Sequence, residues 1–489
     1  MQDVVKFESE LAGIASPDEN RRGNQNRMYN KVAMDELARS QPGVDLYTFI
    51  KTAFPADVGI RRNDVVNLRE KDYFRSLQRV MREYNPATVQ NYIVWRVIQH
   101  YAIFLPFAAK LPLYRFQANL TGMAASSPME RWRECVHYTT RVLPMPTGAI
   151  YVQKYFSGAV TLDKMRVMAE EIRSAFIREL KEVEWMDDVT RTQALEKAYR
   201  LTYRIAYPAY FSNDTFMELY WHHLRLNQYS SPLHAAMLMK KQLWEEDAGK
   251  LRDPVDTSWW YQSPAQVEAY YAPSLHQMIF PAGIMQFPFL SPDVPNYITY
   301  AMAGAIIGHE ISHGFDDQGA QYDKNGLLHN WWDKETKDKF NARAECMEKQ
   351  YSSVFIKAAG MNIDGRMSLG ENIADNAGIK TAFLAYQSWA ARQGYEEPKL
   401  PGFQNFSNEQ MFFLAYANNW CSVERPESAR ALLLSDPHAP SKYRALLPLK
   451  NFPEFAKAFG CREGRDPMFP PPSTSSFIPS LIISAQLPR

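Results

Sequence analysis

The pattern of apolar and polar positions predicts a long helical region in the first half of the chain. Apolar residues recur at helical spacing through residues 92–107 and again through residues 167–183, which is typical of amphipathic helices. Residues 184–201 add a helix with a start signal, because Asp187 or Asp188 can serve as its N-cap and strong helix formers follow. We therefore interpret residues 1–255 as a mostly helical scaffold lobe.

The pattern changes in the second half. Aromatic and β-branched residues alternate around turn formers in residues 266–290, which predicts strands. Helical spacing returns in residues 295–314, in residues 360–395, where we expect a pair of helices, and in residues 408–421. The tail, residues 469–489, is rich in proline and serine, a composition typical of disordered segments.

Composition narrows the class of protein. Hydrophobic residues make up 46% and charged residues 22% of the 489 residues, the balance of a folded soluble protein with more than one domain or two lobes. The 55 basic and 54 acidic residues nearly cancel, so no electrostatic feature predicts nucleic acid or an anionic membrane as a partner. No apolar run reaches the roughly 18 residues of a membrane segment, and the first residues lack the pattern of a signal peptide.

The candidate chemistry begins with a histidine motif inside the helix predicted at 295–314. His309 and His313 are four residues apart and therefore share one helical face, where both imidazoles can reach one metal ion. Glu310 lies near the open coordination position and can accept a proton from a water molecule there. Three such residues arise by chance in a chain of this length with a probability on the order of one in a hundred, but the apolar run before them is expected of a buried active-site helix.

A catalytic zinc ion needs a third protein ligand in addition to the two histidines. A further histidine at the metzincin spacing is absent, so the ligand must come from elsewhere. Glu371 and Asp375 share a helical face, so one carboxylate can bind the metal while the other accepts an N–H from a ligand histidine. Judged by spacing alone, such a pair of carboxylates lies more often on the solvated surface of a protein than in a metal site. His329 is a rival ligand, ranked lower because its polar segment lacks a helical pattern.

Several motifs accompany these residues: HEISHGFDDQG, SLGENIADNAG, FPAGI and a downstream WW, together with WMD, RWRECVHY, NWCSVERPE and SDPHAP. From about residue 5 to Met468 the chain resembles the neprilysin and endothelin-converting enzyme family of zinc endopeptidases. The resemblance implies a mainly α fold with a small β component. It also implies two lobes, a thermolysin-like catalytic lobe over residues 256–468 and the helical lobe, which together enclose an active-site cavity.

The resemblance assigns roles to the residues of the zinc site. It implies one zinc ion per chain, held by His309, His313 and Glu371. It also implies that Glu310 is the general base and that Asp375 is hydrogen-bonded to His309.

A second part of the expected site lies in the SDPHAP motif. Peptide hydrolysis builds negative charge on the scissile carbonyl oxygen, and a donor aimed at that oxygen contributes a factor of roughly 10² to 10³. The resemblance places this role on His438, whose tautomer Asp436 could fix, and it places a substrate-binding arginine at Arg444.

Substrate-binding residues follow from the same resemblance. Such peptidases hold the peptide as an added strand, and the family motif Asn-Ala-aromatic-Tyr reads here as Glu268, Ala269, Tyr270 and Tyr271. An ionised glutamate only accepts hydrogen bonds, so this departure affects substrate affinity more than chemistry. The side chain after the cleaved bond is expected in an apolar pocket made by Ile284, Phe289, Ile306 and Trp420.

These features predict a zinc-dependent endopeptidase that hydrolyses oligopeptides on the amino side of large hydrophobic residues. The alternative is a catalytically impaired family member that binds a peptide or a partner without cutting it. A helical interaction protein with an accidental histidine motif fits the continuous resemblance less well.

The glycosylation sequons and the cysteines indicate the cellular compartment in which the protein is expected. Candidate glycosylation sites are Asn119, Asn213 and Asn405. By the resemblance, Cys135, Cys421 and Cys461 would pair with cysteines before the start of this chain. Cys346 would pair with a cysteine after its end. We therefore expect a truncated piece of an extracellular or cell-surface enzyme. The alternative is a short cytosolic form with four free thiols.

Overall fold

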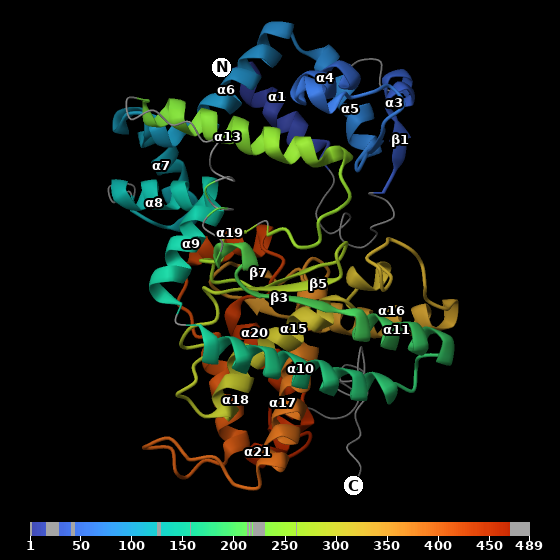
Figure 1. Cartoon of the computed structure of the whole chain (residues 1–489), viewed down its shortest axis with the longest axis vertical. Helices are drawn as coiled ribbons and strands as arrows, with labels where there is room; N and C mark the ends of the chain where they lie inside the picture. Colours follow the sequence, from blue (N-terminus) through green and yellow to red (C-terminus); the bar gives the residue numbers. More distant parts are fainter. Residues whose placement is uncertain are drawn as a thin grey trace. The chain divides into compact units, whose positions relative to one another are not determined.

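The structure is a computed structural model that describes residues 2–15, 29–40, 45–124, 129–156, 158–212, 230–260 and 262–469, together with Thr215 and Glu218 (Figure 1). The chain forms two compact units. Unit 1 comprises Met1–Ala118, Ala124–Leu143 and Ala209–Trp259, and unit 2 comprises Asn119–Met123, Pro144–Pro208 and Trp260–Arg489. Helices dominate both units, so the mainly α fold with a small β component is confirmed.

Unit 1 is built from helices and one small sheet. In it, β1 (Lys31–Ala33) pairs antiparallel with β2 (Val65–Asn67). Its apolar core consists of small clusters, one of which contains Val32, Met34, Leu37 and Leu68. Its helices are α1 (Gln2–Gly13), α3 (Met34–Ser40), α4 (Leu46–Ala53), α5 (Lys71–Glu83), α6 (Pro86–His100), α7 (Phe107–Thr121), α8 (Arg131–Val142) and α13 (Pro232–Gly249), with short 3₁₀ turns at η2 (Ala56–Val58), η3 (Ala102–Phe104), η4 (Ala209–Ser212) and η5 (Lys250–Arg252).

Unit 2 holds the larger core and a three-stranded sheet. The strand order is β3 (Thr202–Ala206), β5 (Gln277–Pro281), β4 (Tyr270–Ala272). β3 is parallel to β5, and β4 pairs antiparallel with β5 in the register Tyr270↔Ile279. β4 is therefore an edge strand of this sheet.

The helices of unit 2 surround a core to which α10, α15 and α17 all contribute. A two-stranded ribbon, β6 (Phe355–Ile356) with β7 (Met361–Asn362), precedes α17. The helices are α9 (Pro144–Tyr155), α10 (Ala159–Lys181), α11 (Asp188–Arg200), α14 (Asn296–Thr299), the π-helical η6 (Tyr300–Gly304), α15 (Ala305–His313), the 3₁₀ turn η7 (Gly319–Gln321), α16 (Lys334–Ser352), α17 (Leu369–Gln393), α18 (Asn408–Asn419), α19 (Pro426–Ser435), α20 (Ser441–Lys450) and α21 (Pro453–Phe459).

Several predicted elements are found where the pattern placed them. α11 begins after Asp187, whose side chain accepts from the backbone N–H groups of Val189 and Thr190, so the predicted N-cap is confirmed. The helical pattern of residues 295–314 corresponds to α14, η6 and α15 in succession.

Two expectations differ from the structure. The strand pattern of residues 266–290 forms only β4 and β5, because the residues after Pro281 include Gly283 and Pro288 and fold into turns instead of a ladder. The helical pair expected in residues 360–395 is one helix, α17; its internal glycines do not break it because neighbouring elements pack against them.

One boundary between the two units lies between Trp259 and Trp260, close to the one expected near residue 255. Residues Pro144–Pro208 belong to unit 2, because the apolar face of α10, including Ile172, Phe176 and Leu180, is buried in the core shared with α17. The expectations for the tail beyond residue 469 and for Asn213 lie outside the described residues.

Candidate metal centre

The helices that carry the predicted ligands touch at two glycines. A Cβ atom on Gly308 of α15 would lie 2.7 Å from the carbonyl oxygen of Gly378, and one on Gly378 of α17 would lie 2.7 Å from the carbonyl oxygen of Ala305. Only glycine permits such a close approach of two backbones. Glu371 lies about two turns before Gly378, and it is thereby brought opposite the histidine that follows Gly308.

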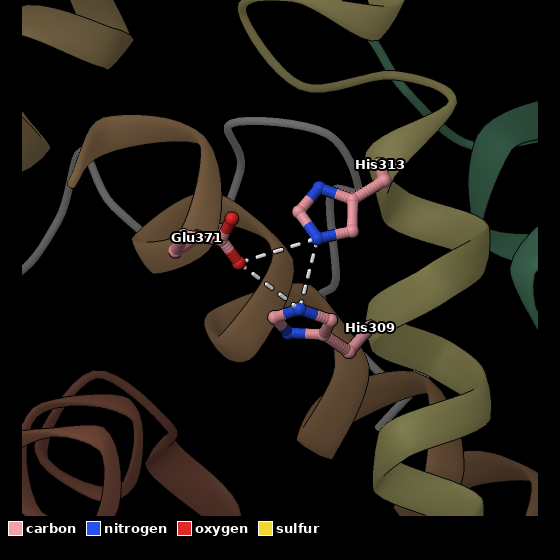
Figure 2. A group of neighbouring side chains, drawn as sticks. All are labelled: His309, His313 and Glu371. Carbon is pink, nitrogen blue, oxygen red and sulfur yellow. Dashed lines mark hydrogen bonds and ion pairs between the residues drawn. The ribbon is translucent and has the colours of Figure 1, made fainter. Parts of the chain in front are cut away.

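The three predicted ligands converge on one point between these helices (Figure 2). The Nε2 atoms of His309 and His313 are 2.9 Å apart, and each lies 3.3 Å from Oε2 of Glu371. These three residues form a group whose ligand atoms all lie within 4.8 Å of one another.

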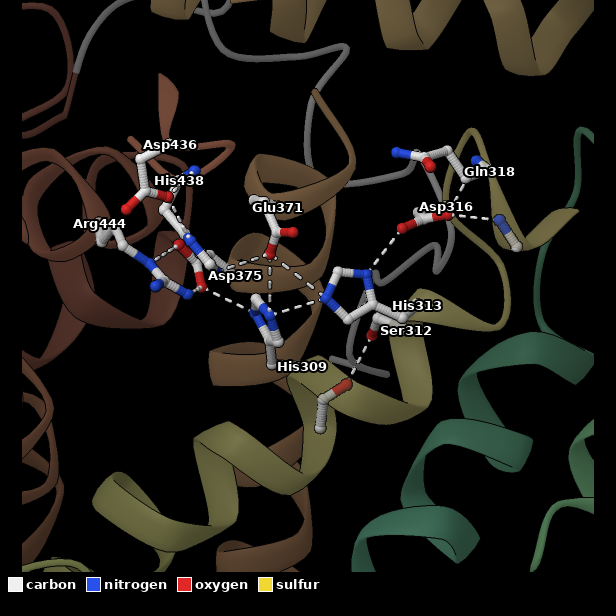
Figure 3. A network of polar contacts seen from close by, with 12 residues as sticks. His309, Ser312, His313, Asp316, Gln318, Glu371, Asp375, Asp436, His438 and Arg444 are labelled. Carbon is white, nitrogen blue, oxygen red and sulfur yellow. Dashed lines mark hydrogen bonds and ion pairs between the residues drawn. The ribbon is translucent and has the colours of Figure 1, made fainter. Parts of the chain in front are cut away.

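The opposite nitrogen of each imidazole faces a carboxylate (Figure 3). Nδ1 of His309 lies 2.8 Å from Oδ1 of Asp375, and Nδ1 of His313 forms a 2.7 Å hydrogen bond with Oδ2 of Asp316. An ionised carboxylate only accepts, so each Nδ1 carries the proton and each Nε2 is directed toward Glu371. Carboxylates that orient ligand histidines in this way are a regular feature of zinc sites.

The donor set fits a zinc ion. Two imidazole nitrogens and a carboxylate oxygen are a ligand combination of catalytic zinc sites, and Oε2 of Glu371 is buried without a hydrogen bond among the described residues. Burial disfavours the charge of His313, but Glu371 and Asp316 outweigh it and raise the pKa of His313 well above its ordinary value. Metal and proton therefore compete for the same position, as expected for a metal ligand.

Asp375 connects His309 to a buried arginine. Its two carboxylate oxygens accept from Nε and Nη2 of Arg444, both at 2.7 Å. Burial opposes the charge of Asp375, yet Arg444 and His309 hold its pKa at about 2. The guanidinium also lies 4.0 Å from the ring centroid of Trp420. Arg444, expected as a substrate-binding residue, thus gives two of its donors to Asp375 in this structure.

Glu310 is buried beside the ligand group. Only 4% of the residue is exposed, and its Oε2 has no hydrogen-bond partner among the described residues. Burial raises the pKa of this carboxyl, and the charge of Glu371 adds to the effect while the nearby histidines oppose it. A carboxylate with a raised pKa is a stronger base, which suits proton abstraction near neutral pH.

His438 reaches the same point from the segment between α19 and α20. Its Nε2 lies 3.2 Å from Oε2 of Glu371, and its Nδ1 bonds to Oδ1 of Asp436 at 2.7 Å (Figure 3). Burial disfavours the imidazolium, but the hydrogen bond to Asp436 and the nearby carboxylate of Glu371 raise the pKa of His438 to about 9. Nε2 of His438 is therefore directed toward the ligand group by the hydrogen bond of its other ring nitrogen to Asp436.

The remaining predicted residues lie in several different places. Ile284, Phe289 and Ile306 line one apolar hollow together with Met165, Phe280, Met285, Leu290 and Ala303. Trp420 does not line this hollow and lies instead against Arg444. Glu268 is exposed and Ala269 is half-buried, both just before the edge strand β4. The rival ligand His329 is exposed and does not belong to the ligand group.

The candidate glycosylation sites and the cysteines bear on the cellular compartment of the protein. Asn119 at the end of α7 and Asn405 before α18 are both exposed. The four cysteines form no disulfide with one another. None of the described helices combines the length and the apolar character that crossing a bilayer requires.

Sequence reasoning missed two interactions of the site. Asp316 is the partner of His313, and its position three residues later on the chain was the available signal. The pairing of Arg444 with Asp375 joins residues 69 positions apart, and no local pattern points to it.

Comparison with known proteins gives the family. Two models of peptidase family M13 match the chain, one over residues 1–208 and the other over residues 268–475. The chain belongs to peptidase family M13. Among curated M13-like relatives, Neprilysin-21 of Caenorhabditis elegans is 45% identical over 471 residues, which cover 96% of this chain and 61% of that protein. Endothelin-converting enzyme 1 of Homo sapiens is 34% identical over 478 residues, which cover 96% and 60%.

These relatives confirm the resemblance to neprilysin and endothelin-converting enzyme, and the chain spans about three fifths of their length. Solved structures agree with the M13 assignment. Zinc metalloprotease ZMP1 of Mycobacterium tuberculosis, in complex with an inhibitor, superposes with a TM-score of 0.84 at 26% identity, covering 97% of this chain and 69% of that one. PepO from Lactobacillus rhamnosis gives a TM-score of 0.81 at 25% identity, covering 97% and 70%.

Proposed function

We propose that this M13 chain is a zinc-dependent endopeptidase of oligopeptides. The observation that carries the proposal is the convergence of two imidazole Nε2 atoms and one buried carboxylate oxygen, with Glu310 buried beside them. His309, His313 and Glu371 would hold one zinc ion. When bound, zinc supplies a Lewis acid that polarises the scissile carbonyl and activates water.

The residues of the chain provide the remaining chemistry. Glu310 accepts the proton of the attacking water, because its buried carboxylate has a free oxygen and a raised pKa. It then delivers that proton to the leaving amine. His438, held by Asp436, donates to the oxygen that becomes negative as the carbonyl is attacked.

Substrate binding follows from the elements next to the centre. The edge strand β4, preceded by Glu268 and Ala269, offers backbone groups to an extended peptide. The apolar hollow lined by Ile284, Phe289 and Ile306 has a free volume of only about 10 Å³ in this structure, so it must widen to take a large hydrophobic side chain. By resemblance to the family, that side chain belongs to the residue after the cleaved bond, which places cleavage on its amino side. Arg444 is proposed to contribute to substrate binding next to Asp375.

Zinc analysis combined with peptide hydrolysis tests the function. Purified protein loaded with zinc should contain about one equivalent of metal per chain and should cut a fluorogenic peptide that has Phe or Leu after the cleavage site. A chelator should abolish this cleavage, zinc should restore it, and a matched peptide with Asp at that position should be a poor substrate. Zinc-loaded protein that binds the peptide without cutting it would establish the impaired family member instead.

The compartment is a separate proposal. By family membership we place the protein at the cell surface or outside the cell, where the exposed Asn119 and Asn405 would be glycosylated. Expression in a secretory system, followed by glycosidase treatment and a mobility shift, tests this placement. The variants N119Q and N405Q should each remove one step of the shift.

A further inference from the structure

The residues that follow the metal-binding helix form a loop that holds Asp316. We define this loop as residues 314–322. Oδ1 of Asp316 accepts from the backbone N–H groups of Gln318 at 2.9 Å and Gly319 at 2.6 Å, while Oδ2 accepts from His313 (Figure 3). The position of the carboxylate, and with it the orientation of the His313 ring, therefore depends on the conformation of the loop.

The loop returns to the end of α15. A Cβ atom on Gly319 would lie only 1.7 Å from the carbonyl oxygen of His313, so the loop backbone packs directly on the last residue of the helix. Contacts from outside the loop also hold it, because Nε1 of Trp332 donates to the carbonyl of Ala320 at 2.8 Å.

A lysine from a helix distant in sequence closes the loop, in the sense that it binds the start, the middle and the end of the loop at once. Lys197 lies on α11 and is 1% exposed. Its Nζ donates to the carbonyl oxygens of Gly314 at 2.7 Å, Gly319 at 2.8 Å and Tyr322 at 2.6 Å. The ammonium also lies 5.3 Å from the ring centroid of Phe315. All three donors of the ammonium are thus used by three points of one loop.

Burial of the Lys197 ammonium would be unfavourable if the loop carbonyls did not accept its hydrogen bonds. A buried ammonium is tolerated only when its donors are satisfied, and burial lowers the pKa of Lys197 to about 7, against the opposing charges of Asp316 and Asp323. Lys197 is also linked to the edge strand through His276. The backbone carbonyl of Lys197 accepts from Nε2 of His276 at 2.7 Å. Nδ1 of His276 accepts from the hydroxyl of Tyr271 on β4, also at 2.7 Å.

We propose that Lys197 is a positioning residue of the metal centre: its ammonium closes the loop 314–322, and the closed loop holds Asp316 where it orients His313. The inference rests on the proposed function, because it concerns the orientation of a proposed zinc ligand. It goes beyond that site because it assigns a role to a residue that touches neither metal nor substrate.

The first test compares two buried lysines of unit 2. K197M removes the three donors at similar side-chain length. K380M is the matched control, because Lys380 is 6% exposed and forms a 3.1 Å ion pair with Glu179 on α10, outside the ligand group. Zinc dissociation constants are measured by competition with a chromophoric chelator, the Co²⁺ derivatives by their visible absorption, and metal-free stability by thermal unfolding.

We expect K197M to bind zinc roughly 10- to 100-fold more weakly, as losses in the shell around metal ligands do, with an altered Co²⁺ spectrum. K380M should lose thermal stability yet keep the wild-type zinc affinity and spectrum. Unchanged zinc affinity in K197M, or an equal loss in K380M, would overturn the proposal. Wild-type protein that binds no zinc would sink the proposed function as well, so the two failures are distinguishable.

The second test asks whether Lys197 acts through Asp316. In a double-mutant cycle on zinc affinity, K197M should add little to the loss caused by D316N, because both changes release the same carboxylate contact. Fully additive losses would refute this route. If K197M does not fold, K197Q, which keeps a neutral donor, should fold with an intermediate zinc affinity; failure of both variants to fold would show that Lys197 serves folding alone and would overturn the inference.

Discussion

Asp375 is the residue whose removal most directly tests how the metal centre is organised. Its carboxylate makes three contacts, one with Nδ1 of His309 at 2.8 Å and two with Arg444 at 2.7 Å. D375A removes all of them and leaves a buried guanidinium without its counter-charge. We expect a loss of zinc affinity of roughly 10- to 100-fold and a loss of roughly 3 to 5 kcal/mol in the free energy of unfolding.

D375N should give a smaller loss of zinc affinity for a geometric reason. Oδ1 lies 2.8 Å from Nδ1 of His309 and accepts from Nη2 of Arg444, whereas Oδ2 accepts from Nε of Arg444 alone. An asparagine placed with its oxygen at the Oδ1 position keeps the contact to His309 and opposes only one donor of Arg444. We therefore expect D375N to bind zinc between wild type and D375A, with most of the stability loss retained.

The effect on stability should depend on pH. The pKa of Asp375 is depressed in the folded state to about 2 from its ordinary 3.8, so its stabilising contribution is present above about pH 4 and is lost as the pH falls toward 2. Linkage gives this contribution as ~2 kcal/mol. In metal-free protein the stability difference between wild type and D375N should accordingly shrink over that window in urea titrations.

A companion variant separates orientation from charge balance. R444M in the D375A background removes the unpaired buried cation, so it should restore part of the stability without restoring zinc affinity. Zinc affinity is measured by chelator competition and stability by urea unfolding of the metal-free protein. If R444M recovers the zinc affinity of D375A, Asp375 acts by neutralising Arg444, and the claim that it orients His309 is wrong.

Three further changes address the other roles. E310Q should keep its zinc and lose nearly all hydrolysis, because only the base is removed; metal analysis and turnover of the same sample check this, and substantial residual turnover contradicts the role. E371A should lose its metal whereas H329A should not, measured by zinc content after dialysis; the reverse result means that the third ligand is wrong. E268N should lower KM for peptides with little change in kcat, because a carboxamide both donates and accepts and recovers roughly 0.5 to 1.5 kcal/mol per hydrogen bond; an unchanged or higher KM shows that Glu268 has a partner of its own.

The proposed ligand residues were accessible from the sequence because their signals are local. His309 and His313 are related by helical spacing, and Glu371 and Asp375 by the same spacing on a second helix. Glu371 was ranked above His329 because His329 lies in a polar segment without a helical pattern, and the resemblance favoured the same choice. In the structure Glu371 belongs to the candidate ligand group while His329 is exposed.

The helical pair predicted in residues 360–395 is wrong because packing, and not the local pattern, decides there. Glycines inside residues 360–395 do not interrupt α17, because Gly378 is the point where α15 touches it. Likewise, the pattern of α10 identified an amphipathic helix, but only the partner of its apolar face shows that it belongs to unit 2. In both cases, periodicity shows that a face is apolar and does not show which element covers it.

The two buried cations that we propose to support the ligands, Arg444 and Lys197, lie beyond the reach of local patterns for the same reason. Arg444 reaches Asp375 from 69 positions away, and Lys197 reaches the loop after α15 from more than a hundred. Each buries a cation, which is favourable only against acceptors already held in place. A basic residue in the sequence is ordinarily predicted to be exposed. A metal motif thus identifies the donor atoms, whereas the geometry that makes them a site depends on buried charges whose partners are set by the tertiary fold.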